Sequence, residues 1–244
     1  YDLYQCIYAL YSASPELGAA EDLEYDVEGL VEEMEHADGV ITARILRLFR
    51  SIIEQTFEEK EKRLEAYKQV EVDDIPDALS YVDWSGTVAE VGGSLFSNLV
   101  LAHTLPNANH RTSLALLELY IQAHEYGFTL PDVATDDFKW QTWVNNFIRD
   151  SKRILTVRRN NLTFHYLWKY GCNEVERKDG ITIHLKDYEL GMPNHEAYRK
   201  YADRHRECCT EMTEEILCRE GYDELLDEPG FGKQQFAERL EEMR

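Results

Sequence analysis

The chain has 244 residues, 43% of them hydrophobic, which is enough to bury the core of one large domain or of one domain with an extension. It carries 47 acidic residues against 26 basic ones, a formal charge of −21. So anionic a surface repels a phosphate backbone, and we expect no nucleic-acid partner. The acidic excess and the scarcity of lysine (ten, against sixteen arginines) favour a halophilic protein over an ordinary acidic one, because high salt screens self-repulsion.

Hydropathy and cysteine content place the protein in the cytoplasm. No run of about 18 apolar residues is present, so no membrane-spanning helix is predicted. Residues 1–14 contain Asp2 and lack a basic region, which is not the pattern of a signal peptide. The five cysteines are too few and too unevenly spaced for a disulfide framework, which favours a reducing compartment.

The first third of the chain is predicted to hold two helices and a connector. Apolar residues at a spacing of three and four predict an acidic amphipathic helix over 21–38, which Gly39 would end. The same spacing predicts a longer helix over 40–68. Residues 70–86 break the period with a proline, paired acids and a glycine, so we expect a connector with a short extended piece at 70–72.

A helix predicted over 87–103 contains two adjacent glycines, Gly92 and Gly93. Each glycine weakens a helix by about 1 kcal/mol relative to alanine. Close packing of another backbone would offset that cost, so we expect a second element to lie against this pair.

The remaining elements are again mostly helical. The predicted fold class is therefore all-α with one small β-hairpin. The sequence suggests an N-terminal helical segment (1–39), a helical core (40–160) and a C-terminal helical extension with the hairpin (161–244). Helices are predicted over about 109–125, 136–159, 162–170, 195–219 and 233–243, and the hairpin over 174–185 with its turn at Asp179-Gly180.

One segment, residues 99–119, combines groups suited to phosphate chemistry. A helix is predicted to end at His103, and the next begins after a turn over 104–109. The N-terminus of a helix presents backbone N–H groups and the positive end of its dipole, which together bind anions. Ala108 would let an anion approach these groups closely, and Arg111 adds a planar cationic fork that suits phosphate oxygens. The imidazole of His103 can take a proton from a hydroxyl near neutral pH.

The same residues also have a purely structural interpretation. Asn107 would cap the second helix, His103 would be a buried residue at a helix end, and Arg111 would form a surface ion pair. On the residues alone, the loop is either a phosphoryl- or nucleotidyl-transfer site or a part of the scaffold.

The string resembles the core motif of the Fic/Doc family, His-x-Phe-x-Asp/Glu-Gly/Ala-Asn-x-Arg. Four positions match, and Leu105 stands in for the phenylalanine. Ala108 and the Arg111-Thr112 pair are closer to the Doc toxin branch than to the Gly-Asn-Gly adenylylating branch. The resemblance covers about 20 residues directly and extends loosely over 40–160. The matching residues are His103, Ala108, Asn109 and Arg111 in the string His103-Thr104-Leu105-Pro106-Asn107-Ala108-Asn109-His110-Arg111.

The resemblance implies a Fic-like helical bundle that modifies a Ser, Thr or Tyr hydroxyl of a protein substrate. Such a transferase uses ATP or another nucleotide for AMPylation or phosphorylation. A toxin of this type would have an antitoxin or regulatory protein as its partner. His103 would be the general base, and Asn109 and Arg111, with the amides of Ala108 and His110, would bind the phosphates. In the family an extended flap clamps the target, and residues 70–84 occupy its place in the sequence.

Three departures from the family pattern bear on this function. Asn107 stands where an acidic residue coordinates Mg²⁺, and a neutral amide is a weaker ligand for that cation. Leu114 replaces the second arginine of adenylylating members, and His110 replaces the lysine of Doc-like members. The metal would then be held mainly by the nucleotide phosphates or have a reduced role. Alternatively, the protein is a catalytically impaired nucleotide- or anion-binding module, or an interaction protein in which the loop is structural.

Two further clusters have both a functional and a structural interpretation. The basic stripe on the helix predicted over 136–159 could attract a nucleotide or pair with acidic helices. His205, Cys208 and Cys209 share a helix face, which is compatible with zinc or with a core position. The tyrosines are scattered and indicate no stacking platform. The stripe consists of Arg149, Lys152, Arg153 and Arg159.

Overall fold

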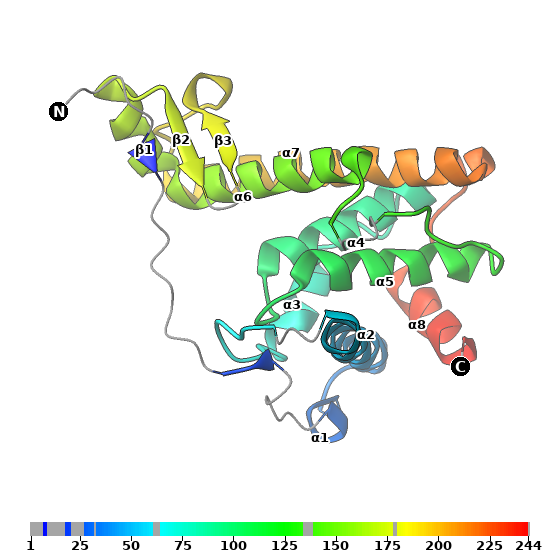
Figure 1. Cartoon of the computed structure of the whole chain (residues 1–244). Helices are drawn as coiled ribbons and strands as arrows, with labels where there is room; N and C mark the ends of the chain where they lie inside the picture. The colour runs from blue at the N-terminus through cyan, green and yellow to red at the C-terminus, as the bar shows by residue number, and fades with distance from the viewer. Residues whose placement is uncertain are drawn as a thin grey trace. The chain divides into compact units, whose positions relative to one another are not determined.

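The chain forms two compact units, each described here by itself. The hairpin unit comprises residues 1–12 and 134–208, and the motif unit comprises residues 13–133 and 209–244. The boundaries expected from the sequence, after residues 39 and 160, both lie inside helices. The computed structural model (Figure 1) describes residues 7–8, 18–20, 27–31, 33–60, 64–133, 139–177 and 180–243.

The motif unit is a bundle of helices. Helix α4 packs against α5, and α5 also packs against α2 and α8. Most of α4 is buried, as expected of a helix that is apolar around most of its circumference. Nowhere in the described ranges is a helix both long and apolar enough to cross a bilayer. The elements are α1 (Val27–Val31), α2 (His36–Lys60), α3 (Asp74–Ser80), α4 (Val88–Ala102), α5 (Asn109–His124), residues 209–220 of α7 (Asn194–Glu220), the 3-10 helix η3 (Asp223–Leu226) and α8 (Lys233–Glu242).

The glycine pair in α4 lies against another backbone, as the sequence predicts. A Cβ atom added at Gly93 would lie 2.5 Å from the Cα atom of Thr210 in α7. One added at Gly92 would lie 2.7 Å from a methyl group of Leu117 in α5. The pair therefore allows two helices to approach α4 more closely than a side chain would permit.

Gly39 does not end a helix, so the prediction for the first two helices is wrong in this detail. α2 begins at His36 and continues through Gly39 to Lys60 rather than to residue 68. A Cβ atom at Gly39 would lie 3.2 Å from the carbonyl oxygen of Val31 at the end of α1. Gly39 thus allows α1 and α2 to pack closely and does not end a helix.

The stretch predicted as a connector, 70–86, contains the helix α3. Its inward side carries Ile75, Ala78 and Leu79, which are buried at a spacing of three and four. Pro76 lies in the first turn of α3, where the missing N–H has no intrahelical acceptor to lose. Pro76 is therefore compatible with the start of a helix. The short extended piece expected at 70–72 forms no strand.

The hairpin unit contains the predicted hairpin and a strand that was not predicted. β2 (Glu174–Arg177) pairs antiparallel with β3 (Ile181–His184), with Glu174 opposite His184 and Arg177 opposite Ile181. Gly180 has φ +63°, a left-handed conformation that suits glycine; Asp179 lies outside the described residues. β1 (Ile7–Tyr8) adds a parallel strand to the other edge of β2.

The two helices predicted over 136–159 and 162–170 are a single element, α6 (Thr142–Lys169), with a kink at Asn160. α6 contributes Ile154, Val157 and Phe164 to a buried cluster that also includes residues of the sheet. The side-chain amide of Asn160 donates to the carbonyl oxygen of Thr156 at 2.9 Å, so it replaces part of the interrupted backbone bonding.

Arg149 and Arg153 of the basic stripe and His205 of the His/Cys face make structural contacts in the hairpin unit. Arg149 donates to the carbonyl oxygen of Gly180 at 3.0 Å, and Arg153 donates to that of Thr182 at 2.9 Å. His205 is buried, and its Nε2 lies 2.7 Å from the hydroxyl oxygen of Ser151. The described part of the chain holds no group of three or more His, Cys, Asp or Glu that could bind a metal ion.

Candidate functional site

The candidate site is the motif loop, defined as residues 103–108 between α4 and α5. α4 begins with a capping box in which Thr87 and Glu90 exchange hydrogen bonds, and it ends at Ala102. His103 follows in the left-handed region (φ +55°), and its N–H donates to the carbonyl oxygen of Leu99 at 3.1 Å. Histidine is one of the few non-glycine residues enriched in this region. The sequence thus predicts both the end of the helix and the position of His103.

The start of α5 is formed by a second left-handed residue. Ala108 precedes the helix with φ +54° and has no side chain that could cap it. The first backbone bond of α5 runs from the N–H of Thr112 to the carbonyl oxygen of Ala108 at 2.9 Å. The N–H groups of residues 109–111 therefore form the positive end of the helix dipole beside the loop.

Asn107 is not the N-cap, contrary to the structural interpretation of its role. Its Oδ1 accepts from the N–H of Ala108 at 2.7 Å, one residue before the helix. Its Nδ2 donates to the carbonyl oxygen of Glu65 at 3.0 Å. Both ends of the amide are thus used to hold the loop against a neighbouring segment.

Asn109 braces the loop from inside. Its side chain is 7% exposed. Its Oδ1 accepts from the N–H of Leu105 at 3.1 Å, and its Nδ2 donates to the carbonyl oxygen of Leu105 at 2.9 Å. The side chain of Asn109 therefore hydrogen-bonds to the loop, whereas the resemblance implies that this residue contacts a phosphate.

A segment without helix or strand, residues 64–71, contacts the motif loop; we call it the flanking segment. Besides the bond from Asn107, the N–H of Glu71 donates to the carbonyl oxygen of Thr104 at 2.9 Å. On the other side, the N–H of Ala66 donates to the carbonyl oxygen of Gly18 at 2.9 Å, within an antiparallel bridge. The resemblance placed an extended flap at 70–84, but α3 occupies residues 74–80 of that range, and the segment that contacts the motif loop begins earlier in the chain.

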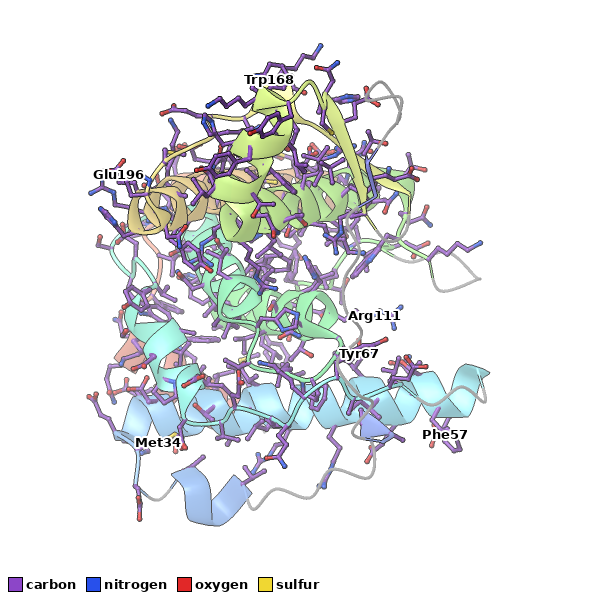
Figure 2. All side chains as sticks on the ribbon, turned by 90° about the vertical axis from the view of Figure 1, so that its left-hand side faces the viewer. Met34, Phe57, Tyr67, Arg111, Trp168 and Glu196 are labelled. Atoms are coloured by element: carbon purple, nitrogen blue, oxygen red, sulfur yellow. The ribbon has the colours of Figure 1, made fainter. Side chains whose placement is uncertain are left out.

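The two remaining predicted residues, His110 and Arg111, lie in the first turn of α5. The ring of His110 packs edge-on against Phe96 of α4, with 6.3 Å between the ring centroids. Arg111 is half-buried, and Figure 2 shows it on the same side of the motif unit as Tyr67 of the flanking segment. The structure therefore brings the predicted residues into one helix–loop–helix. Sequence reasoning missed the flanking segment because it carries no motif of its own.

The protein is mainly helical. The motif loop joins α4 to α5, and a residue with a left-handed backbone conformation lies at each end of it, His103 and Ala108. The profile of a family of unknown function (DUF8172) matches residues 1–244, and the chain belongs to this family. No curated protein and no solved structure matches the chain significantly.

Proposed function

We propose that the protein is a nucleotide-dependent transferase of the Fic/Doc type that modifies a hydroxyl group of another protein. The observation that carries the proposal is the motif loop. It holds His103 six residues before the first residue of α5 and leaves the small residue Ala108 at the entrance of that helix. A helix N-terminus of this form favours a phosphate, and Arg111 lies in its first turn.

In the proposed reaction, His103 removes the proton of the substrate hydroxyl while the hydroxyl oxygen attacks phosphorus. Attack on the α-phosphate of ATP forms an AMP ester and releases pyrophosphate. Attack on the γ-phosphate forms a phosphate ester and releases ADP. The N-terminus of α5 and Arg111 would hold the charged oxygens of the nucleotide.

The residues do not fit a Mg²⁺ ion bound directly by the protein at the motif. Asn107 replaces the acidic residue of the family, and its amide oxygen already accepts the N–H of Ala108. A hard cation prefers carboxylate oxygens. We assign no step to a metal ligand from the loop, and a bound cation would have to be held by the nucleotide phosphates.

A second candidate function is a nucleotide- or anion-binding module without transferase activity. Asn107 and Asn109 favour it, because both amides are committed to hydrogen bonds within the motif unit. Leu114 favours it as well. It stands at the position of the family's second arginine and is 4% exposed, so this position contributes to the core. Both candidates keep the phosphate-binding role of α5 and differ in whether a group is transferred.

The test incubates the intact protein and cell extract with ATP labelled at the α- or the γ-phosphate. Label from the α position alone indicates AMPylation, and label from the γ position alone indicates phosphorylation. His103→Ala should abolish labelling while nucleotide binding persists, and Arg111→Ala should lose both. Arg47→Ala is the matched control, because Arg47 is an exposed arginine of α2.

Other results would decide against the transferase. Nucleotide binding that depends on Arg111 without any transferred label supports the binding module. Absence of nucleotide binding contradicts both candidates and leaves an interaction protein with a structural loop. A partner of the antitoxin or regulatory type would be found as a protein that suppresses labelling.

A further inference from the structure

The connection from η3 to α8 crosses one end of the α4–α5 pair; we call its residues 228–232 the strap. The N–H of Val88, the first residue of α4, donates to the carbonyl oxygen of Glu228 at 2.9 Å. A Cβ atom added at Gly230 would lie 2.6 Å from the hydroxyl oxygen of Tyr120 in α5. The strap therefore lies tightly against both helices, at the end of the pair opposite the motif loop.

His124, the last residue of α5, gives the strap a hydrogen-bond acceptor that can titrate. Its side chain is 0% exposed, and its ring stacks on that of Phe231 with 3.7 Å between the ring centroids. The N–H of Phe231 donates to Nε2 of His124 at 3.3 Å. A ring nitrogen accepts only when it carries no proton, so the proton of the neutral ring lies on Nδ1. The bond from the strap therefore requires a neutral His124.

The other bonds that tie the strap to the two helices do not change near neutral pH. The N–H of Gly230 donates to the carbonyl oxygen of Gly86 at 2.9 Å, and this bond, like that of Val88, joins two backbone groups. The hydroxyl group of Tyr120 donates to the carbonyl oxygen of Phe231 at 3.3 Å, and burial raises the pKa of this hydroxyl above its usual value of 10. Among these bonds, only the one to the histidine responds between pH 5 and pH 8.

The groups that face the ring of His124 come from three elements: Tyr120 from α5, Glu228 from the strap and Arg239 from α8. Burial has the largest effect and lowers the pKa of His124 below its usual value of 6.5. Glu228 raises this pKa and Arg239 lowers it. The Oε1 atom of Glu228 lies 3.7 Å from Nδ1, too far for a hydrogen bond. Glu90, the only charged residue of α4, is bonded within the capping box.

We propose that His124 is a pH-sensitive latch, and that protonation of its ring releases the strap from α5. A proton added at Nε2 converts the acceptor into a donor that faces another donor, the N–H of Phe231. The added proton also places a charge at a buried position, which is unfavourable until the ring reaches water. Both effects favour an open strap at acidic pH.

The opening should be local, because α8 has other anchors on α2. The ammonium group of Lys233 lies 2.9 Å from a carboxylate oxygen of Asp38. The guanidinium of Arg44 donates to the carbonyl oxygen of Leu240 at 2.8 Å. Neither contact involves the strap, so α8 stays in place when the strap opens.

The test measures amide hydrogen exchange of the full chain by NMR between pH 7.5 and pH 5.5, expressed as protection factors. In the open state the ring has a pKa of about 6.5, so linkage limits the loss of protection over this range to about tenfold. We expect a severalfold loss at Phe231 and Gly230 and a smaller loss at Leu95 and Leu240. These last two amides, in α4 and α8, report wider unfolding, to which protonation of the buried His205 also contributes.

Three variants identify the group that titrates. His124→Gln keeps an acceptor for the N–H of Phe231 but has no proton to gain, so the strap should lose no more protection than the reference amides. Glu228→Gln removes a carboxylate that favours the protonated ring in the closed state, so the loss should be at least as large as in the unmodified protein. His36→Gln is the matched control and should change nothing, because the side chain of His36 is 62% exposed and pairs with Glu241 at 3.3 Å.

Three results would overturn the proposal: protection of Phe231 that does not depend on pH, an equal loss at Leu95, or an unchanged loss in His124→Gln. If His124→Gln does not fold, Glu228→Gln decides. A smaller loss in that variant would assign the titration to the carboxylate and contradict the latch, whereas an equal or larger loss supports it.

Discussion

Replacing Ala108 by glycine should stabilise the protein, although alanine-to-glycine changes usually destabilise. Ala108 adopts φ +54° and ψ +17° immediately before α5. A side chain in this left-handed conformation costs about 1–2 kcal/mol, which glycine avoids. Glycine also lowers stability by about 0.4–1 kcal/mol through the larger entropy of the unfolded chain. The difference predicts a net gain of about 0.5–1 kcal/mol, or a rise of the melting temperature by about 1–4 °C for a chain of this size.

Ala115→Gly is the matched control, because Ala115 lies in the interior of the same helix. There glycine removes no strain and should cost about 1 kcal/mol. Urea unfolding of the two variants and of the unmodified protein, monitored by circular dichroism at 222 nm, gives both changes in the free energy of unfolding. Two changes of the same chemistry should therefore shift stability in opposite directions. If Ala108→Gly destabilises as much as Ala115→Gly, the left-handed start of α5 is wrong, and with it the anion site that we infer there.

Two further predictions test the packing of the motif unit and a buried histidine of the hairpin unit. Gly93→Ala should cost about 3 kcal/mol in urea unfolding, because its Cβ would lie 2.5 Å from the backbone of Thr210. Gly92→Ala should cost less, because the nearest atom that its Cβ would meet is the end of a flexible leucine and the other close atoms also belong to side chains. Burial lowers the pKa of His205 from 6.5 to about 3. The unfolded chain therefore takes up the proton first, and the stability present above pH 6.5 should fall by about 2 kcal/mol between pH 6.5 and pH 5. His205→Gln should flatten this decline, and an unchanged slope would contradict the assignment.

The helices on both sides of the motif loop could be predicted almost to the residue. The predicted ranges 87–103 and 109–125 correspond to α4 (Val88–Ala102) and α5 (Asn109–His124). Both helices carry clear local signals: a capping box at Thr87, a long apolar period and a proline in the loop between them. Local signals of this kind act within one turn, so they do not depend on the rest of the fold.

The errors occurred where a residue serves a distant contact. Gly39 has the usual appearance of a helix end, but its role is the close approach of α1. β1 is two residues long and depends on pairing with β2, more than 160 residues later. The flanking segment is held by the backbone of Gly18 and by the motif loop. No local pattern encodes such partners, because they are chosen by tertiary packing.

The four residues that match the family motif do not carry equal weight for function. Ala108 and Asn109 have structural reasons to be where they are: a small residue suits the left-handed start of α5, and Asn109 bridges both backbone groups of Leu105. A protein that lost the chemistry would still need them to keep this loop. The functional hypothesis therefore depends on His103 and Arg111.

Arg111 gives the sharper test of the two. A cation in the first turn of a helix destabilises the folded state by about 0.3–1 kcal/mol through its repulsion by the helix dipole. A surface ion pair stabilises the folded state by about the same amount. Arg111→Gln should therefore leave stability within about 0.5 kcal/mol of the unmodified protein, as is usual for a surface substitution. If Arg111 binds phosphate, the same change should abolish nucleotide binding in calorimetric titration. A large loss of stability with unchanged nucleotide binding would show that Arg111 belongs to the scaffold, and the resemblance would then describe the shape of the loop without its chemistry.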